Sequence, residues 1–154
     1  LAQHVQIALA KGDLDMLREA YKDFHPQVRA VLDACPEVHK WALVERDPFP
    51  KWGDGRITLM GDACHPMTPY MAQGAAMSIE DAAILSRCLD GVGRDGVVAG
   101  LRRYEESRMA RTARIQTISR LNDTNKIKAE INNTYGYDAW SAPLAEETTG
   151  VAAE

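Results

Sequence analysis

The chain has 154 residues, 45% of them hydrophobic and 26% charged, and its net charge at pH 7 is −4. The length suits one domain with a real core, and the composition is ordinary for a globular protein. The acidic balance gives no whole-chain reason to expect a nucleic-acid partner, and no apolar run approaches the length of a membrane span, so we expect neither kind of partner.

The chain begins at Leu1, inside a stretch at residues 2–13 that resembles a helix, and we therefore expect a fragment of a longer protein. The three cysteines, Cys35, Cys64 and Cys88, are odd in number and unevenly spaced. This pattern does not indicate a disulfide framework, so we expect a reduced, cytoplasmic setting.

In the first third of the chain, the pattern predicts two short helices and a strand. Asp13 can cap the first helix. The second is expected over residues 26–35, where Pro26 is tolerated in the first turn. Its apolar positions predict a buried face of Val28, Val31 and Leu32. The partial alternation in residues 39–46 favours a strand.

Residues 47–55 are dense in proline and glycine and predict a loop, which is the best candidate for a boundary between two structural units. The run RITLM at residues 56–60 predicts a strand that ends at Gly61. Such a strand needs neighbours to cover its edges, so we expect the isolated chain to be marginally stable.

Two helices follow, over residues 75–89 and from residue 97 to about residue 122 or further. The first is expected to bury Ile79, Ala82, Ala83 and Leu85. Between the helices, residues 91–96 match G-x-G-x-x-G, the dinucleotide-binding fingerprint. That fingerprint must follow a strand, whereas this match follows a helix, so we interpret its glycines as helix caps.

The long helix and the residues after it are rich in basic side chains: Arg102, Arg103, Arg108, Arg111, Arg114, Arg120, Lys126 and Lys128. Glu105 and Glu106 interrupt this series, and no aromatic residues are interleaved to stack on bases. We therefore predict a solvated helix face with one arginine turned inward.

Asp62 directly follows Gly61 at the end of the expected strand. Glycine lets the backbone turn and approach a ligand closely, and an aspartate there can accept hydrogen bonds from the hydroxyls of a sugar or polyol. The alternative is an aspartate that only caps the next turn, as many strand-end aspartates do.

The next segment favours a ligand site. Pro66 and Pro69 stiffen the loop, and Gln73, Gly74 and Ala75 open the helix without bulky side chains. Free backbone N–H groups and the positive end of the helix dipole suit an electron-rich or anionic ring edge. A loop that simply connects strand to helix remains the alternative.

Cys64 and His65 raise the question of a Cys-His nucleophile or a metal site. Adjacent residues on an irregular loop point in different directions, and no third ligand stands at metal spacing. We therefore expect no metal and interpret both as polar loop residues. Asp81 is expected to favour the dipole of its helix, which is a plain stability role.

One motif joins these residues: residues 56–59, residues 61–65 (GDACH), Pro69, residues 73–75 (QGA) and residues 80–82 (EDA). With this motif the chain resembles the C-terminal part of a class A FAD-dependent aromatic-ring hydroxylase. Residues 67–77 and the segment YGYDA at residues 135–139 resemble the salicylate hydroxylase-like and 6-hydroxynicotinate 3-monooxygenase-like members. The N-terminal G-x-G-x-x-G and the middle Asp-Gly motif of that family have no counterpart here.

The resemblance implies a mixed α/β fold, a fragment of a Rossmann-like FAD-binding monooxygenase. Residues 1–50 would end a substrate domain, residues 51–130 would form the C-terminal part of the FAD-binding domain, and residues 131–154 a C-terminal tail. The resemblance also implies that Asp62 binds the ribityl chain of FAD and that His65 and Tyr70 are candidates for substrate contact. The residues implied around the flavin are Gly61, Pro69, Gln73, Gly74 and Ala75.

Enzymes of this family use NAD(P)H to reduce FAD, and a flavin C4a-hydroperoxide then transfers oxygen to an aromatic ring. The implied partners are O2 and a small aromatic substrate, with 6-hydroxynicotinate as one candidate, and the fragment alone is expected to be inactive. Two other hypotheses stay open: a non-catalytic α/β nucleotide-binding module that uses the same Gly61-Asp62 loop, and a helical partner-binding segment built on the long helix.

Overall fold

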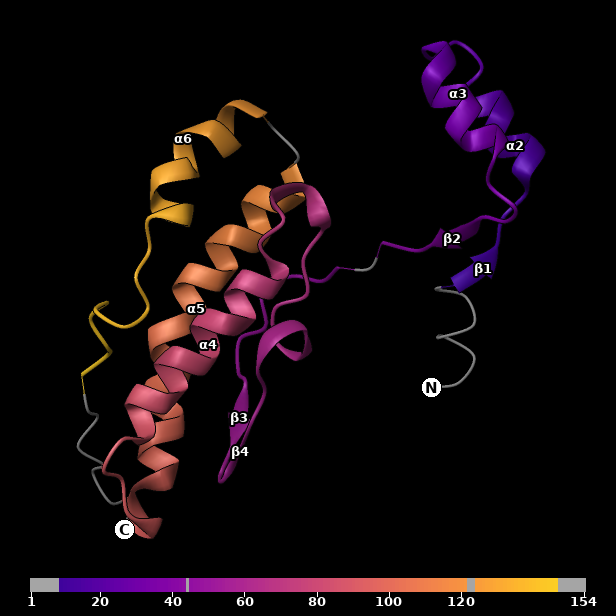
Figure 1. The fold of residues 1–154 in the computed structure, drawn as a ribbon. Coiled ribbons are helices and arrows are strands. Elements are labelled where there is room, and N and C mark those ends of the chain that lie inside the picture. Colours follow the sequence, from indigo (N-terminus) through magenta and orange to yellow (C-terminus); the bar gives the residue numbers. More distant parts are fainter. Residues whose placement is uncertain (1–8, 44, 122–123, 147–154) are drawn as a thin grey trace. The chain divides into compact units, whose positions relative to one another are not determined.

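The computed structural model describes residues 9–43, 45–121 and 124–146. The chain divides between residues 43 and 44 into two compact units, each described here by itself (Figure 1). The expected assignment of residues 1–50, 51–130 and 131–154 to parts of two domains and a tail stays a prediction.

In the first unit, a two-stranded antiparallel ladder joins β1 (Leu9–Lys11) to β2 (His39–Trp41), with Leu9 opposite Trp41. The expected helix over residues 2–13 is therefore wrong for residues 9–11, and its earlier residues lie outside the described part. The strand expected over residues 39–46 is confirmed at its beginning, and it is shorter than predicted.

Between these strands lie α2 (Leu14–Ala20) and α3 (Pro26–Asp33). The Asp13 carboxylate accepts hydrogen bonds from the N–H groups of Asp15 and Met16 at 2.8 and 3.2 Å, which confirms the predicted helix cap. The predicted buried face of α3 is wrong, because Val28 is 39% exposed and Val31 67% exposed. Two short helices on a three-residue ladder enclose too little volume for a core.

The second unit opens with a small hairpin of β3 (Gly53–Asp54) and β4 (Ile57–Thr58), which turns at Gly55 with φ of +57°. The strand expected over residues 56–60 is thus shorter, and its partner lies inside the segment expected to be loop. The carboxylate of Glu105 accepts hydrogen bonds from the N–H groups of Trp52 and Gly53 at 2.8 and 3.1 Å and so fastens the hairpin to the long helix α5 (Val97–Leu121).

Two long helices, α4 (Gly74–Leu89) and α5 (Val97–Leu121), pack side by side, and the chain reverses direction between them (Figure 1). Gly91, with φ of +68°, lies just after the end of α4. The G-x-G-x-x-G match therefore lies in a turn between two helices, as expected. A third helix, α6 (Thr124–Tyr135), packs against α5, and the sequence did not predict it.

The core of this unit consists of two apolar clusters. One contains Trp52, Cys64, Ile84, Cys88 and Tyr104, and the other contains Met71, Met77, Ile115 and Ile118. The predicted inner face of α4 is partly wrong, because Ile79 is 72% exposed while Asp81 is fully buried. The apolar pattern misplaced the face because a charged pair with Arg108 draws Asp81 inward. No helix in the described part of the chain is long and apolar enough to cross a membrane.

Candidate functional site

Asp62 lies next to the first turn of α4. It sits in a 3₁₀ turn, Gly61–Ala63, and its side chain is exposed. An ideal Cβ placed on Gly74, the first residue of α4, would stand 3.8 Å from Asp62 Oδ1. The structure therefore brings together the carboxylate and the helix N-terminus that the sequence singled out.

The N-terminus of α4 has no side-chain cap. Gln73 occupies the capping position and makes no capping hydrogen bond, and Gly74, Ala75 and Ala76 follow it. The first N–H groups of a helix have no partner within the helix, and they carry the positive end of its dipole. An exposed carboxylate and uncapped N–H groups at one place suit a ligand with hydroxyl donors and an electron-rich edge.

Distant side chains hold the loop between Asp62 and α4. The side-chain amide of Gln116 donates to the carbonyl oxygen of Pro66 at 3.0 Å. The hydroxyl of Ser119 donates to the backbone carbonyl oxygen of Thr68 at 2.6 Å. These two donors lie on α5. Because irregular backbone must find partners outside itself when it is buried, such contacts fix the loop. Sequence analysis missed these donors, because Gln and Ser in a helix carry no pattern that marks them as partners of a loop.

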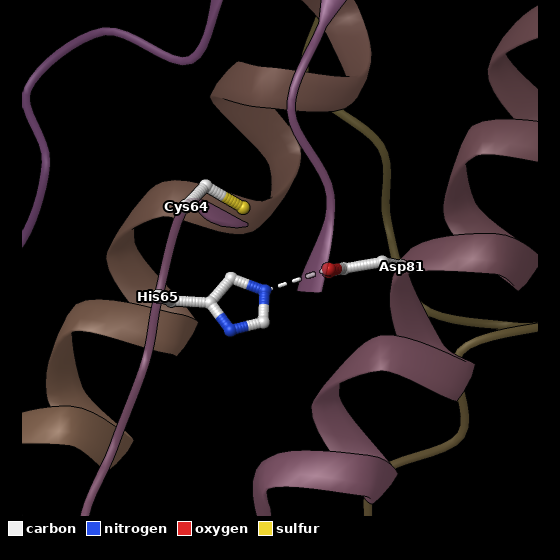
Figure 2. A group of neighbouring side chains, drawn as sticks. All are labelled: Cys64, His65 and Asp81. Atoms are coloured by element: carbon white, nitrogen blue, oxygen red, sulfur yellow. Dashed lines mark hydrogen bonds and ion pairs between the residues drawn. The ribbon is translucent and has the colours of Figure 1, made fainter. Parts of the chain in front are cut away.

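Cys64 and His65 follow Asp62 and point inward. Both side chains are fully buried, which corrects the expectation that they are polar loop residues. Figure 2 shows them converging with Asp81 of α4, to which His65 Nε2 is hydrogen-bonded at 2.6 Å. Spacing along the chain indicated no third ligand near Cys64 and His65, and the fold supplies one 16 residues beyond His65.

Asp81 is the centre of this cluster. Its Oδ2 also accepts the Gly61 N–H at 3.0 Å, and its Oδ1 accepts the Nε–H of Arg108 at 2.7 Å. Burial alone would raise the pKa of Asp81, but the hydrogen bonds from His65, Arg108 and Gly61 outweigh it and hold the pKa below its ordinary value. The role predicted for Asp81, favouring the helix dipole, is therefore wrong: it is an ionised, buried acceptor.

Arg108 is the inward-turned arginine that the sequence predicted on the long helix, and its side chain is fully buried. Its Nη1 lies 2.8 Å from Glu80 Oε2, and its Nη2 donates to the carbonyl oxygen of Met77 at 3.3 Å. The rest of the predicted solvated face is partly wrong, because the Arg111 side chain is only 14% exposed and forms a bidentate contact with Glu80.

Cys64, His65 and Asp81 could in principle hold a metal ion, since their ligand atoms lie within 4.8 Å of one another. Two observations disfavour this. Asp81 Oδ1 already accepts a hydrogen bond from the Arg108 guanidinium, and Oδ2 accepts one from the Gly61 N–H, and a cation would have to displace these contacts. Burial, followed by the negative charge of Asp81, raises the pKa of Cys64 to about 12, so the thiol is protonated near neutral pH and a metal ion would have to displace its proton.

The other predicted site residues fall into two groups. Pro69, Tyr70 and Ala75 are exposed, as a ligand site requires, and Tyr70 is 48% exposed. Gly61, His65 and Gln73 are buried. The ring of His65 has no accessible surface, which argues against the predicted contact with a substrate.

Comparisons with known proteins identify the family of the chain. A family model described as FAD binding domain matches residues 19–119. The chain is 48% identical over 130 residues to 6-hydroxynicotinate 3-monooxygenase of Bordetella bronchiseptica, covering 84% of this chain and 34% of that protein. It is 46% identical over 107 residues to 3-hydroxybenzoate 6-hydroxylase 1 of Aquipseudomonas alcaligenes, covering 69% of this chain and 26% of that protein.

Among solved structures, a salicylate hydroxylase substrate complex matches with a TM-score of 0.73 and 27% identity, over 87% of this chain and 37% of that one. The chain thus spans about a third of the length of the 6-hydroxynicotinate 3-monooxygenase and of the salicylate hydroxylase. The matched family model, the identities and the shared fold together show that the chain belongs to the family of FAD-binding domains found in flavin-dependent aromatic hydroxylases.

Proposed function

We propose that this chain supplies part of the FAD site of an aromatic hydroxylase, with Asp62 and the first turn of α4 as its contacts with the cofactor. The observation that carries the proposal is the position of the Asp62 carboxylate beside an uncapped helix N-terminus. Asp62 would accept hydrogen bonds from the ribityl hydroxyls. Gly74 and Ala75 would present N–H groups to the pyrimidine edge of the flavin, and Gly61, Pro69 and Gln73 would shape the surrounding backbone.

The donor set fits this cofactor. A ribityl chain offers neutral hydroxyl donors that match an exposed carboxylate, and negative charge on a flavin ring is favoured by a helix dipole. Bound FAD, reduced by NAD(P)H, supplies the activation of O2, while the protein orients the cofactor and excludes water. The same features would also suit a non-catalytic nucleotide-binding module, but the relatives are monooxygenases and hydroxylases, which favours an enzyme.

For the complete enzyme we propose a hydroxylated aromatic or N-heteroaromatic acid as substrate, with 6-hydroxynicotinate as the first candidate. This choice rests on the identities of 48% and 47% to two 6-hydroxynicotinate 3-monooxygenases. Tyr70, exposed on the loop before α4, is the candidate contact with the substrate. A reduced, cytoplasmic setting is part of the same proposal and accords with the three free cysteines.

A titration of flavin fluorescence on the complete enzyme tests the cofactor site. Asp62→Ala should raise the Kd for FAD by roughly tenfold or more, since a hydrogen bond to a charged group contributes about 1.5–3 kcal/mol and 1.4 kcal/mol is tenfold. Asp95→Ala is the matched control, because it removes an exposed carboxylate near the opposite end of α4. Equal Kd values for Asp62→Ala and the parent enzyme would overturn the assignment.

Turnover separates the substrates. NAD(P)H oxidation should be coupled to a hydroxylated product, with a higher kcat/KM for 6-hydroxynicotinate than for 3-hydroxybenzoate. Oxidation of NAD(P)H without a hydroxylated product from either acid would contradict the proposed activity.

A further inference from the structure

The buried cluster around Asp81 lies directly behind the proposed cofactor contact. Asp81 binds the N–H of Gly61, the residue before Asp62, and the ring of His65, three residues after Asp62. The two ends of the segment that carries Asp62 are therefore tied to one carboxylate on α4. The Asp62 side chain itself remains exposed.

Arg108 fixes that carboxylate in turn. Its Nε donates to Asp81 Oδ1 at 2.7 Å, and its Nη1 lies 2.8 Å from Oε2 of Glu80, which is on α4 like Asp81. The guanidinium fork thus sets the rotation of α4 about its axis relative to α5. A planar fork with several directed hydrogen bonds gives this precision, which a lysine ammonium does not.

Helix packing alone does not account for this arrangement. A buried ion pair gains little net stability over apolar side chains of similar volume, because both charges lose their hydration. Leu101 and Ile115 already pack α5 into the unit without polar contacts. What the ion pair adds is directional: it presents a carboxylate oxygen to the Gly61 N–H at a defined position.

The conformation of Gly61 makes that position matter. With φ of +61°, Gly61 turns the chain sharply, so a small rotation of its peptide groups moves Asp62 relative to the first turn of α4. We propose that Asp81 and Arg108 are positioning residues for Asp62, which hold its carboxylate in the place where FAD binds. This inference rests on the proposed function, and neither residue touches the cofactor.

A double-mutant cycle on the complete enzyme tests the inference, with the Kd for FAD as the readout. Asp81→Asn should raise the Kd for FAD by about tenfold. This magnitude is taken by analogy from metal sites, where removal of a residue that orients a ligand weakens binding by about tenfold or more. In an Asp62→Asn background, which keeps a hydrogen-bond acceptor and a measurable affinity, Asp81→Asn should have little further effect. Residues that act through one another are non-additive, whereas independent structural effects add.

Two further variants keep the test decisive. Leu101→Ala removes a buried side chain from α5 two turns before Arg108, so it should lower the Tm of the enzyme and leave the Kd unchanged. Arg108→Lys preserves the charge beside Asp81 and removes the fork, so it should raise the Kd even if Asp81→Asn does not fold.

The outcomes separate the two proposals. An equal increase in Kd for Asp81→Asn in both backgrounds, or an increase that Leu101→Ala reproduces at the same loss of Tm, would overturn the positioning role. An unchanged Kd for Asp62→Asn and Asp62→Ala would instead overturn the cofactor site itself.

Discussion

Gly61 lies against Ser78: a Cβ built on Gly61 would stand 2.7 Å from the hydroxyl oxygen of Ser78. Two constraints therefore act on this one position, since its φ of +61° also disfavours every side chain. Gly61→Ala should lower the free energy of unfolding by about 1–2 kcal/mol from the backbone alone and by more from the contact.

Removing the hydroxyl separates these two costs. In the double variant Gly61→Ala/Ser78→Ala, the nearest remaining contact would be 3.4 Å, to the Cβ of residue 78, which is ordinary packing distance. Denaturant titrations should therefore show that Gly61→Ala costs less stability in the Ser78→Ala background than in the parent. An equal loss in both backgrounds would show that the contact with Ser78 is relieved in another way.

The low pKa of Asp81 predicts a pH dependence of stability. A carboxyl group with a lowered folded-state pKa stabilises the protein above its ordinary pKa, about 3.9, and this contribution is lost as the pH falls through the folded-state value. Denaturation measured from pH 7 down to pH 3 should thus give a steeper fall for the parent than for Asp81→Asn. Parallel curves would indicate that folding does not lower the pKa of Asp81.

Tyr135 connects α6 to the loop before α4, because its hydroxyl donates to the carbonyl oxygen of Met71 at 3.1 Å. Tyr135→Phe should cost about 1 kcal/mol or less in stability, since the side chain is 61% exposed. Because the loop also carries Tyr70, the variant should raise the KM for the aromatic substrate without changing the Kd for FAD. Tyr137→Phe is the matched control, because Tyr137 contacts Arg111 through its ring, at 3.7 Å, and phenylalanine keeps that ring. An equal change in KM for Tyr135→Phe and Tyr137→Phe would refute the connection between Tyr135 and the substrate.

The sequence predicted the local features of the site well. The turn after Gly61, the exposed position of Asp62 and the small residues that open α4 each follow from residue types within a few positions of one another. Local rules also explain the cap at Asp13 and the reversal at residues 91–96.

The features that failed depend on pairs far apart in the chain. Asp81 has the appearance of an acidic residue in the first turns of its helix until Arg108 is placed against it, and neither residue marks the other in the sequence. The face of α4 was misplaced for the same reason, because an apolar pattern does not predict that a carboxylate lies inside while Ile79 lies outside. Burial of charge is decided by tertiary partners, which local periodicity does not contain.

The hydrogen bonds that hold residues 61–71 have a consequence for biosynthesis. The partner of Gly61, Asp81, is made 20 residues later, and the carbonyl oxygens of Thr68 and Met71 bind Ser119 and Tyr135, which follow them by 51 and 64 residues. At about 5–20 residues per second, a ribosome completes the motif of residues 56–82, Asp81 included, seconds before it makes Ser119 and Tyr135. A nascent or truncated chain that stops before α5 would carry the sequence of the proposed site without its geometry.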